Sequence, residues 1–270
     1  MKRAYLVVVA FLVGLADAAF VALTRYMGRS GAISYLAPGS YPTLETFAAN
    51  QVGRLGKMEI LWQPLWDSML YPTAGVLNLL FFQTPQGQGQ SAQPIAAAAV
   101  KSAQDTNMTQ PGQLAAPQAF WVDGIECQVQ AGSVSTANLF ASPATTVFAA
   151  ANAATVQTGE NDESLILSSG MLSLTIMQKE YYREAPLFRF PPRSVMRLDG
   201  NQSTTSATAG IVSKNKLWNA GKPVKLDPGF GIATSANFQV ALTWPAVVAT
   251  AANNARIVVY LPGWLFRAAQ

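Results

Sequence analysis

Hydrophobic and polar positions alternate in several short segments of this 270-residue chain, a pattern that predicts half-buried β-strands. The clearest alternation lies in residues 171–177, where Leu172, Leu174 and Ile176 share one face of the expected strand. Further strands are predicted at 57–63, 76–83, 119–129, 165–167, 237–243 and 256–261. The segment 119–129 fits either one strand or a hairpin that turns at Asp123 and Gly124.

The segments between these strands are long and irregular. Residues 84–117 are dominated by Gln, Ala, Gly, Pro, Ser and Thr, which predicts a long loop with a short helix near 95–103. The Ala-rich stretch 144–156 fits a short helix or a turn within a loop. The pattern of about eight or nine strands without a βαβ repeat favours an antiparallel β-sandwich, and long loops suit a jelly roll. A double jelly roll needs twice as many strands, so we expect a single one.

The first residues of the chain have a different character. Residues 4–24 are apolar except for Asp17, and as a helix they would span roughly 30 Å, about the thickness of a hydrocarbon core. The flanking charges are all positive: Lys2, Arg3, Arg25 and Arg29. The segment also resembles a secretory signal peptide with small residues at 16–18. Because the apolar run continues past those residues, we expect a retained membrane helix.

The sequence therefore predicts three parts. Residues 1–27 form the N-terminal hydrophobic helix, residues 28–50 a linker or arm rich in Gly, Ser, Tyr and Pro, and residues 51–270 the jelly-roll domain.

Charge is scarce throughout the chain. Charged residues make up 12% of the sequence, whereas typical soluble domains have about 25%. A surface with so few charges is expected to face partners, lipid or copies of the same chain. The 18 Lys and Arg residues are scattered and form no basic cluster, so specific nucleic-acid binding is not predicted.

The residue types needed for catalysis are sparse. The chain has no histidine, which excludes histidine-based triads and histidine-ligated zinc. The one cysteine, Cys127, lies in an apolar segment and is expected to be buried and inert. Asp123 and Glu126 could form a carboxylate pair, but a spacing of three places them on opposite faces of a strand. We therefore expect no enzyme and no cofactor.

An acidic cluster lies at Glu160, Asp162 and Glu163. It lacks the spacing and the glycine of a calcium loop, so a solvated turn is favoured, and whether an ion binds there stays open.

Two sets of residues are candidates for contacts between subunits. Arg189, Arg193 and Arg197 recur at intervals of four in a segment with Pro191 and Pro192, which prevents a helix. This segment is expected to be an extended strap whose arginines bind carboxylates of a neighbouring copy. The tryptophans that flank Pro64 are the second set, as anchors of an interface: Trp62 and Trp66.

The chain resembles coat proteins of tailless, membrane-containing icosahedral bacteriophages in two segments. One is the motif FFQTPQGQGQ after the second predicted strand, and the other is the closing segment from WNAGKPVKLDPG to YLPGWLFRAAQ. The resemblance implies a jelly-roll capsid subunit of the virion, without catalytic residues, that binds copies of itself, other capsid proteins and an underlying lipid membrane through residues 4–24. The apolar N-terminus departs from many coat proteins.

Two other functions fit the sequence less well. A signal-anchored β-sandwich of the bacterial cell envelope that binds a ligand explains the N-terminus but not the low charge. A carbohydrate-acting enzyme on a sandwich scaffold would lose turnover when Asp123 or Glu126 is substituted.

Overall fold

The computed structural model describes residues 43–55, 57–93, 100–134, 161–193, 195–202, 211–218, 223–250 and 254–269. The predicted N-terminal helix 1–27 and the Ala-rich stretch 144–156 lie outside these residues. The chain divides into two compact units at the boundary between Pro42 and Thr43, and the second unit is described below.

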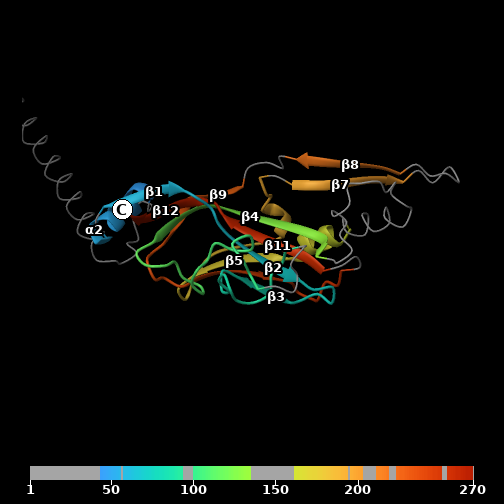
Figure 1. Cartoon of the computed structure of the whole chain (residues 1–270), viewed down its shortest axis with the longest axis horizontal. Helices are drawn as coiled ribbons and strands as arrows, with labels where there is room; N and C mark the ends of the chain where they lie inside the picture. The colour runs from blue at the N-terminus through green and yellow to red at the C-terminus, as the bar shows by residue number, and fades with distance from the viewer. Residues whose placement is uncertain are drawn as a thin grey trace, which may run out of the picture. The chain divides into compact units, whose positions relative to one another are not determined.

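The second unit is mainly β and its sheets are antiparallel, as the alternation predicts (Figure 1). Its elements are the helix α2 (Leu44–Leu55) and the strands β1 (Met58–Trp62), β2 (Leu65–Tyr71), β3 (Asn78–Phe81), β4 (Ala119–Val134), β5 (Met171–Ile176), β6 (Lys179–Glu184), β7 (Val195–Gln202), β8 (Ile211–Trp218), β9 (Val224–Ile232), β10 (Phe238–Thr243), β11 (Asn254–Leu261) and β12 (Gly263–Ala268).

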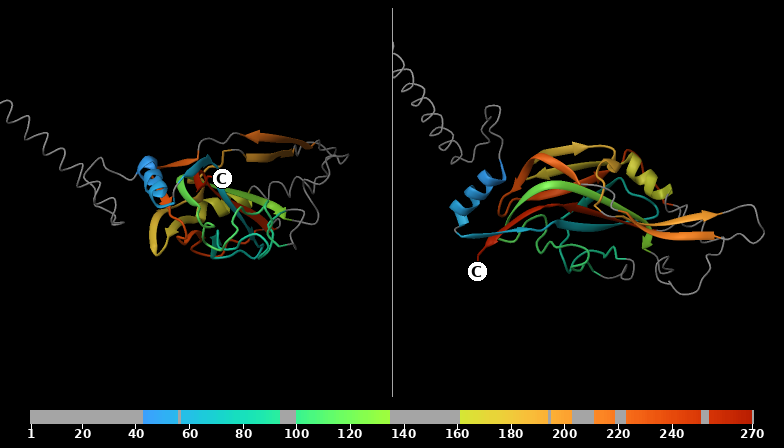
Figure 2. Two further views of the ribbon diagram at one scale, coloured as in Figure 1. Left: turned by 60° about the vertical axis from the view of Figure 1, so that its left-hand side comes forward. Right: turned by 90° about the horizontal axis from the view of Figure 1, so that it is seen from above.

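The first sheet has the order β1-β12-β4-β11-β2, with β9 paired to β4. Within this sheet only a short interruption separates β1 from β2, and another separates β11 from β12. The two interruptions lie opposite one another, because Trp62 pairs with Trp264 before them and Leu65 pairs with Leu261 after them. Each pair is therefore one long strand interrupted once. These strands and β4 bend along their length (Figure 2).

The second sheet has the order β3-β10-β5-β6. The predicted face of β5 is confirmed, since Leu172, Leu174 and Ile176 are buried. They belong to one hydrophobic core together with residues of the first sheet such as Val122 and Val259. The two sheets thus pack face to face around a single core.

Helix α2 covers part of the outer face of the first sheet. Its start is set by Thr43, whose Oγ1 accepts a hydrogen bond from the N–H of Thr46 at 3.2 Å, as an N-cap residue does. The Phe47 ring lies 5.5 Å from Trp121 and 5.4 Å from Phe266, measured between ring centroids. A Cβ at Gly231 would lie 2.3 Å from the Phe47 ring, so a glycine is required beneath the helix. The arm predicted for residues 28–50 therefore gives way, from Thr43, to a packed helix.

Other segments differ from the sequence prediction. Residues 161–169 are helical, so the strand expected at 165–167 and the turn expected at the acidic cluster are wrong. Asp162 and Ile166, one helical turn apart, are both buried, and this 3.6-residue period outweighs the short apolar run. The hairpin at Asp123 is also wrong, because β4 continues through that residue with a bulge. Of the helix expected at 95–103, residues 100–103 are not helical, and 94–99 lie outside the described residues.

Candidate functional site

Two of the three predicted interface arginines bind carboxylates of their own chain. Nε of Arg189 lies 2.7 Å from Oε1 of Glu184, and Nε of Arg193 lies 2.9 Å from Oε1 of Glu126. Both arginine side chains remain about half exposed. Arg197 lies in β7, and its side chain is outside the described part of the structure. Contacts of these arginines with a neighbouring copy stay a prediction.

The Arg193 contact fastens the predicted strap to β4. The backbone N–H of Arg193 donates a second hydrogen bond to Oε2 of Glu126 at 3.0 Å. Beside it, the N–H of Cys127 donates to the carbonyl oxygen of Phe190 at 3.0 Å. The Glu126 carboxylate is buried, and Arg193 of this strap contacts both of its oxygens.

Asp123 lies at the bulge of β4, where its N–H and that of Gly124 both donate to the carbonyl oxygen of Pro262. Cys127 is buried as predicted, and burial raises the pKa of its thiol to about 12, so the thiolate nucleophile is not formed near neutral pH.

The two predicted interface tryptophans have different surroundings. Trp62 is 45% exposed, packs edge-on against Trp264 with ring centroids 5.1 Å apart, and carries the Arg193 guanidinium 5.7 Å from its ring. It remains a candidate anchor at the surface. Trp66 is half-buried, and its backbone forms hydrogen bonds with Asn107 in a neighbouring segment.

Residues 105–107 lie along the free edge of β2. The N–H of Ser68 donates to the carbonyl oxygen of Asp105 at 2.8 Å, and the N–H of Asn107 donates to the carbonyl oxygen of Trp66 at 3.3 Å. Asp67 and Thr106 form an isolated bridge between these contacts. An uncovered edge strand invites pairing with other chains, so this segment, which we call the edge cover (residues 100–108), protects the sheet.

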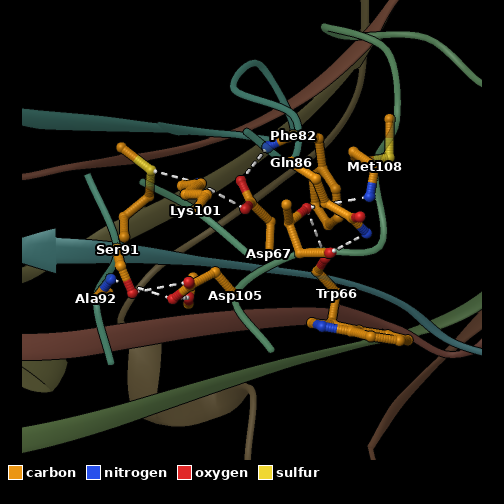
Figure 3. A network of polar contacts seen from close by, with 12 residues as sticks. Trp66, Asp67, Phe82, Gln86, Ser91, Ala92, Lys101, Asp105 and Met108 are labelled. Atoms are coloured by element: carbon orange, nitrogen blue, oxygen red, sulfur yellow. Dashed lines mark hydrogen bonds and ion pairs between the residues drawn. The ribbon is translucent and has the colours of Figure 1, made fainter. Parts of the chain in front are cut away.

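Asp105 holds the edge cover from one face of β2 (Figure 3). Its carboxylate accepts hydrogen bonds from the Ser68 and Ser91 hydroxyls and from the backbone N–H groups of Ala92 and Ser102, at 2.8 to 3.1 Å. Burial by itself would raise the pKa of Asp105, but these hydrogen bonds outweigh it and lower the pKa below its ordinary value.

Asp67 and Lys101 join β2 to the edge cover on the core side. Nζ of Lys101 lies 2.7 Å from Oδ1 of Asp67, with side-chain exposures of 1% and 0% (Figure 3). The second oxygen of Asp67 accepts a hydrogen bond from the N–H of Phe82 at 2.6 Å. Burial raises the pKa of Asp67 despite the opposing effect of Lys101.

This network was not predicted from the sequence, although the sequence contains a signal for it. Between Asp67 and Asp123 the sequence contains only two charged residues, Lys101 and Asp105. Isolated charges in a long uncharged stretch are candidates for buried pairs, because charged residues are fully buried almost only when paired.

The outer face of the second sheet carries no charged side chain on β3, β10 or β5. Its residues, which alternate with the buried core positions, are Asn78, Leu80, Met171, Ser173, Thr175, Gln239, Ala241 and Thr243. Ala241 pairs with Leu80 on one side and Ser173 on the other, so these side chains form one continuous surface. The charged residues of this sheet gather on its edge strand β6.

In the part of the chain that the structure describes, no group of three or more His, Cys, Asp or Glu residues could hold a metal ion. Asp162 and Glu163 both have interaction partners, and Glu160 lies outside the described residues. The helices found there are too short or too polar to cross a bilayer. Lys2, Arg3, Arg25, Arg29 and the apolar run 4–24 fall outside that part.

Comparison with protein-family models, with curated proteins and with solved structures found no match to this chain.

Proposed function

We propose that this chain is a virion structural protein, a capsid subunit that self-assembles into an icosahedral shell. The proposal includes a single jelly-roll fold, supported by the strand order. When β1–β2 and β11–β12 each count as one strand, and the β7–β8 hairpin as an insertion, the eight strands in chain order occupy one sheet as 1-8-3-6 and the other as 2-7-4-5. Two four-stranded sheets with interleaved Greek-key order are the jelly-roll arrangement used by capsid and lectin domains.

The observation that carries self-assembly is the uncharged outer face of β3, β10 and β5. A protein that exposes such a face to water as a monomer would be expected to carry charges there for solubility. Small side chains such as Ser173, Ala241 and Thr243 allow another flat surface to approach closely and exclude water. This face is the proposed contact with another copy of the chain.

The covered edge of β2 supports the same function. A shell subunit reaches high local concentration during assembly, and an open strand edge would pair with the wrong partner. Because residues 105–107 occupy that edge, association through side-chain surfaces is favoured over association through the backbone.

The contact with a lipid membrane rests on the sequence of the N-terminus. A helix over residues 4–24 would be long enough to cross a bilayer, and Lys2, Arg3, Arg25 and Arg29 would bind lipid phosphates at its ends. The proposed location is therefore the capsid of a membrane-containing virion.

Electron microscopy and sedimentation of the full-length protein test assembly directly. We expect regular closed particles from the wild type and their loss in Ala241→Lys, which places a charge in the centre of the uncharged face. Glu180→Gln on β6 changes the net charge by the same amount and is expected to assemble normally. A wild type that stays monomeric at all concentrations, with or without lipid, would overturn the proposal.

A further inference from the structure

We propose that Lys101 and Asp67 react with each other to form an intramolecular amide bond, which fastens the edge cover covalently to β2. The inference concerns the chemistry of the buried pair and does not depend on capsid assembly.

Nζ of Lys101 has few acceptors for its hydrogen bonds. An ammonium group has three hydrogen-bond donors. Among the described residues its partners are one oxygen of Asp67 at 2.7 Å and the thioether sulfur of Met69 at 3.2 Å, which is a weak acceptor. A charge that is sealed from water with one strong partner is costly, and transfer of its proton to the carboxylate removes both charges at once.

The carboxyl group of Asp67 is suited to accept the amine. Burial raises the pKa of this carboxyl group, which favours its protonated and electrophilic form. The N–H of Phe82 points at Oδ2 from 2.6 Å, where negative charge develops when an amine attacks the carboxyl carbon. Phe82 has a φ of 68°, a left-handed conformation that residues other than glycine rarely adopt. The residue with this unusual backbone conformation is the one whose N–H donates to Asp67.

The reaction balances without an added reagent. A proton moves from Nζ to Oδ1 along their contact, which leaves an amine and a carboxylic acid. The nitrogen lone pair then forms a bond to Cγ of Asp67, and the tetrahedral intermediate places its negative charge on Oδ2 beside the Phe82 N–H. The bond from Cγ to Oδ1 breaks, the amine proton goes to the leaving oxygen, and one water is released.

Two features of the site make this step favourable. The fold holds the two groups in contact, and correctly oriented intramolecular reactions reach effective concentrations of about 10⁵–10⁸ M. The near-zero exposure of both side chains also keeps out the water that would hydrolyse the product. Thr106 of the edge cover helps to hold that segment in register with β2, because its hydroxyl donates a hydrogen bond to the carbonyl oxygen of Trp66.

Mass spectrometry of the full-length wild-type protein, after unfolding and digestion with trypsin, tests the bond. The sequence has no Lys or Arg between Lys57 and Lys101, nor between Lys101 and Lys179. An acylated Lys101 resists trypsin, so we expect one peptide covering residues 58–179 with a mass lower by one water, about 18 Da. Fragmentation of this peptide should place the link at positions 67 and 101.

Lys101→Arg is the matched control. Arginine keeps the positive charge and can still pair with Asp67, but its guanidinium does not form the amide, so we expect separate peptides 58–101 and 102–179 with unchanged masses. If the wild type gives the same two peptides at full yield, the amide bond is absent and the pair is an ordinary buried salt bridge.

Discussion

Nε of Arg193 lies 2.9 Å from Oε1 of Glu126, a carboxylate that is almost completely buried while its partner is half exposed. This pair crosses from the strap after β6 to the middle of β4, and the Arg193 backbone binds the same carboxylate. The strap is thus held to β4 by two contacts of Arg193 with one buried carboxylate.

Arg193→Ala is expected to lower the free energy of unfolding by about 1–3 kcal/mol, because it removes a side-chain partner of a buried carboxylate. The matched variant Arg189→Ala removes an exposed partner of Glu184 and should cost only about 0–1 kcal/mol. Urea unfolding of the two variants measures this difference. Equal losses of unfolding free energy would contradict the conclusion that Arg193 stabilises a buried carboxylate and Arg189 a more exposed one.

The same two arginines test the predicted contact between subunits. If they also reach a neighbouring copy, the double variant Arg189→Ala, Arg193→Ala will assemble less well and with a weaker dependence on salt than the wild type. Sedimentation over a range of salt concentrations measures this, and an unchanged profile would remove the arginines from the interface.

Gly231→Ala is expected to displace α2 from the first sheet, because the added Cβ would lie 2.3 Å from the Phe47 ring. Phe47→Ala removes the clash together with part of the packing. The double variant should therefore lose less free energy of unfolding than the two single variants lose in sum. We expect a coupling energy of about 0.5–3 kcal/mol. Thermal unfolding of all four proteins measures this coupling, and strict additivity would show that α2 does not rest on Gly231.

Asp105 is expected to make the edge cover sensitive to acid. Its pKa in the folded protein lies below the ordinary value of 3.8, so the stability it contributes is present above that value. This contribution is lost as the pH falls through the lower folded value. Asp105→Asn should cost about 1–3 kcal/mol at neutral pH, because the amide nitrogen cannot accept hydrogen bonds.

Urea unfolding from neutral pH to below 3.8 checks this prediction. The difference between wild type and Asp105→Asn should shrink toward the acid end of the range. A difference that stays constant with pH would mean that the pKa of Asp105 is the same in the folded and the unfolded protein, so that folding does not stabilise its ionised form.

Deletion of residues 1–27 is expected to abolish membrane binding and leave the β-domain folded, since the second compact unit begins only at Thr43. Flotation with liposomes that contain anionic lipids measures binding, and circular dichroism checks the fold. A truncated protein that still floats would place the membrane contact elsewhere in the chain.

The strands that could be predicted are those with one face in the core and one outside it. In β5, β10 and β11 the apolar residues recur with a period near two, and this pattern depends only on the neighbouring residues. β2 escaped prediction because Asp67 and Ser68 are both buried in the middle of it, one toward the core and one beneath the edge cover. In the sequence alone, polar residues at such positions indicate a loop, because their partners lie far away along the chain.

Prediction of the candidate sites was limited still more by contacts between residues that are far apart in the sequence. The sequence marked Arg189, Arg193 and Trp62 as candidate contacts between subunits, which stays a prediction. Their partners within the chain follow from strand pairing and the course of the strap: Glu184, Glu126 and Trp264. The pairing of Asp67 with Lys101 across 34 residues, and of Asp105 with Ser68 across 37, arises only when the edge cover lies on β2.

The sequence by itself determined the mainly β, antiparallel fold class and the scarcity of charge, because alternation and composition are properties of the chain alone. The tertiary structure decided the strand order, the uncharged outer face and the buried pair of Asp67 and Lys101. Each of these depends on which segments become neighbours, and burial changes the free energy of a charged or polar group only after those neighbours are in place.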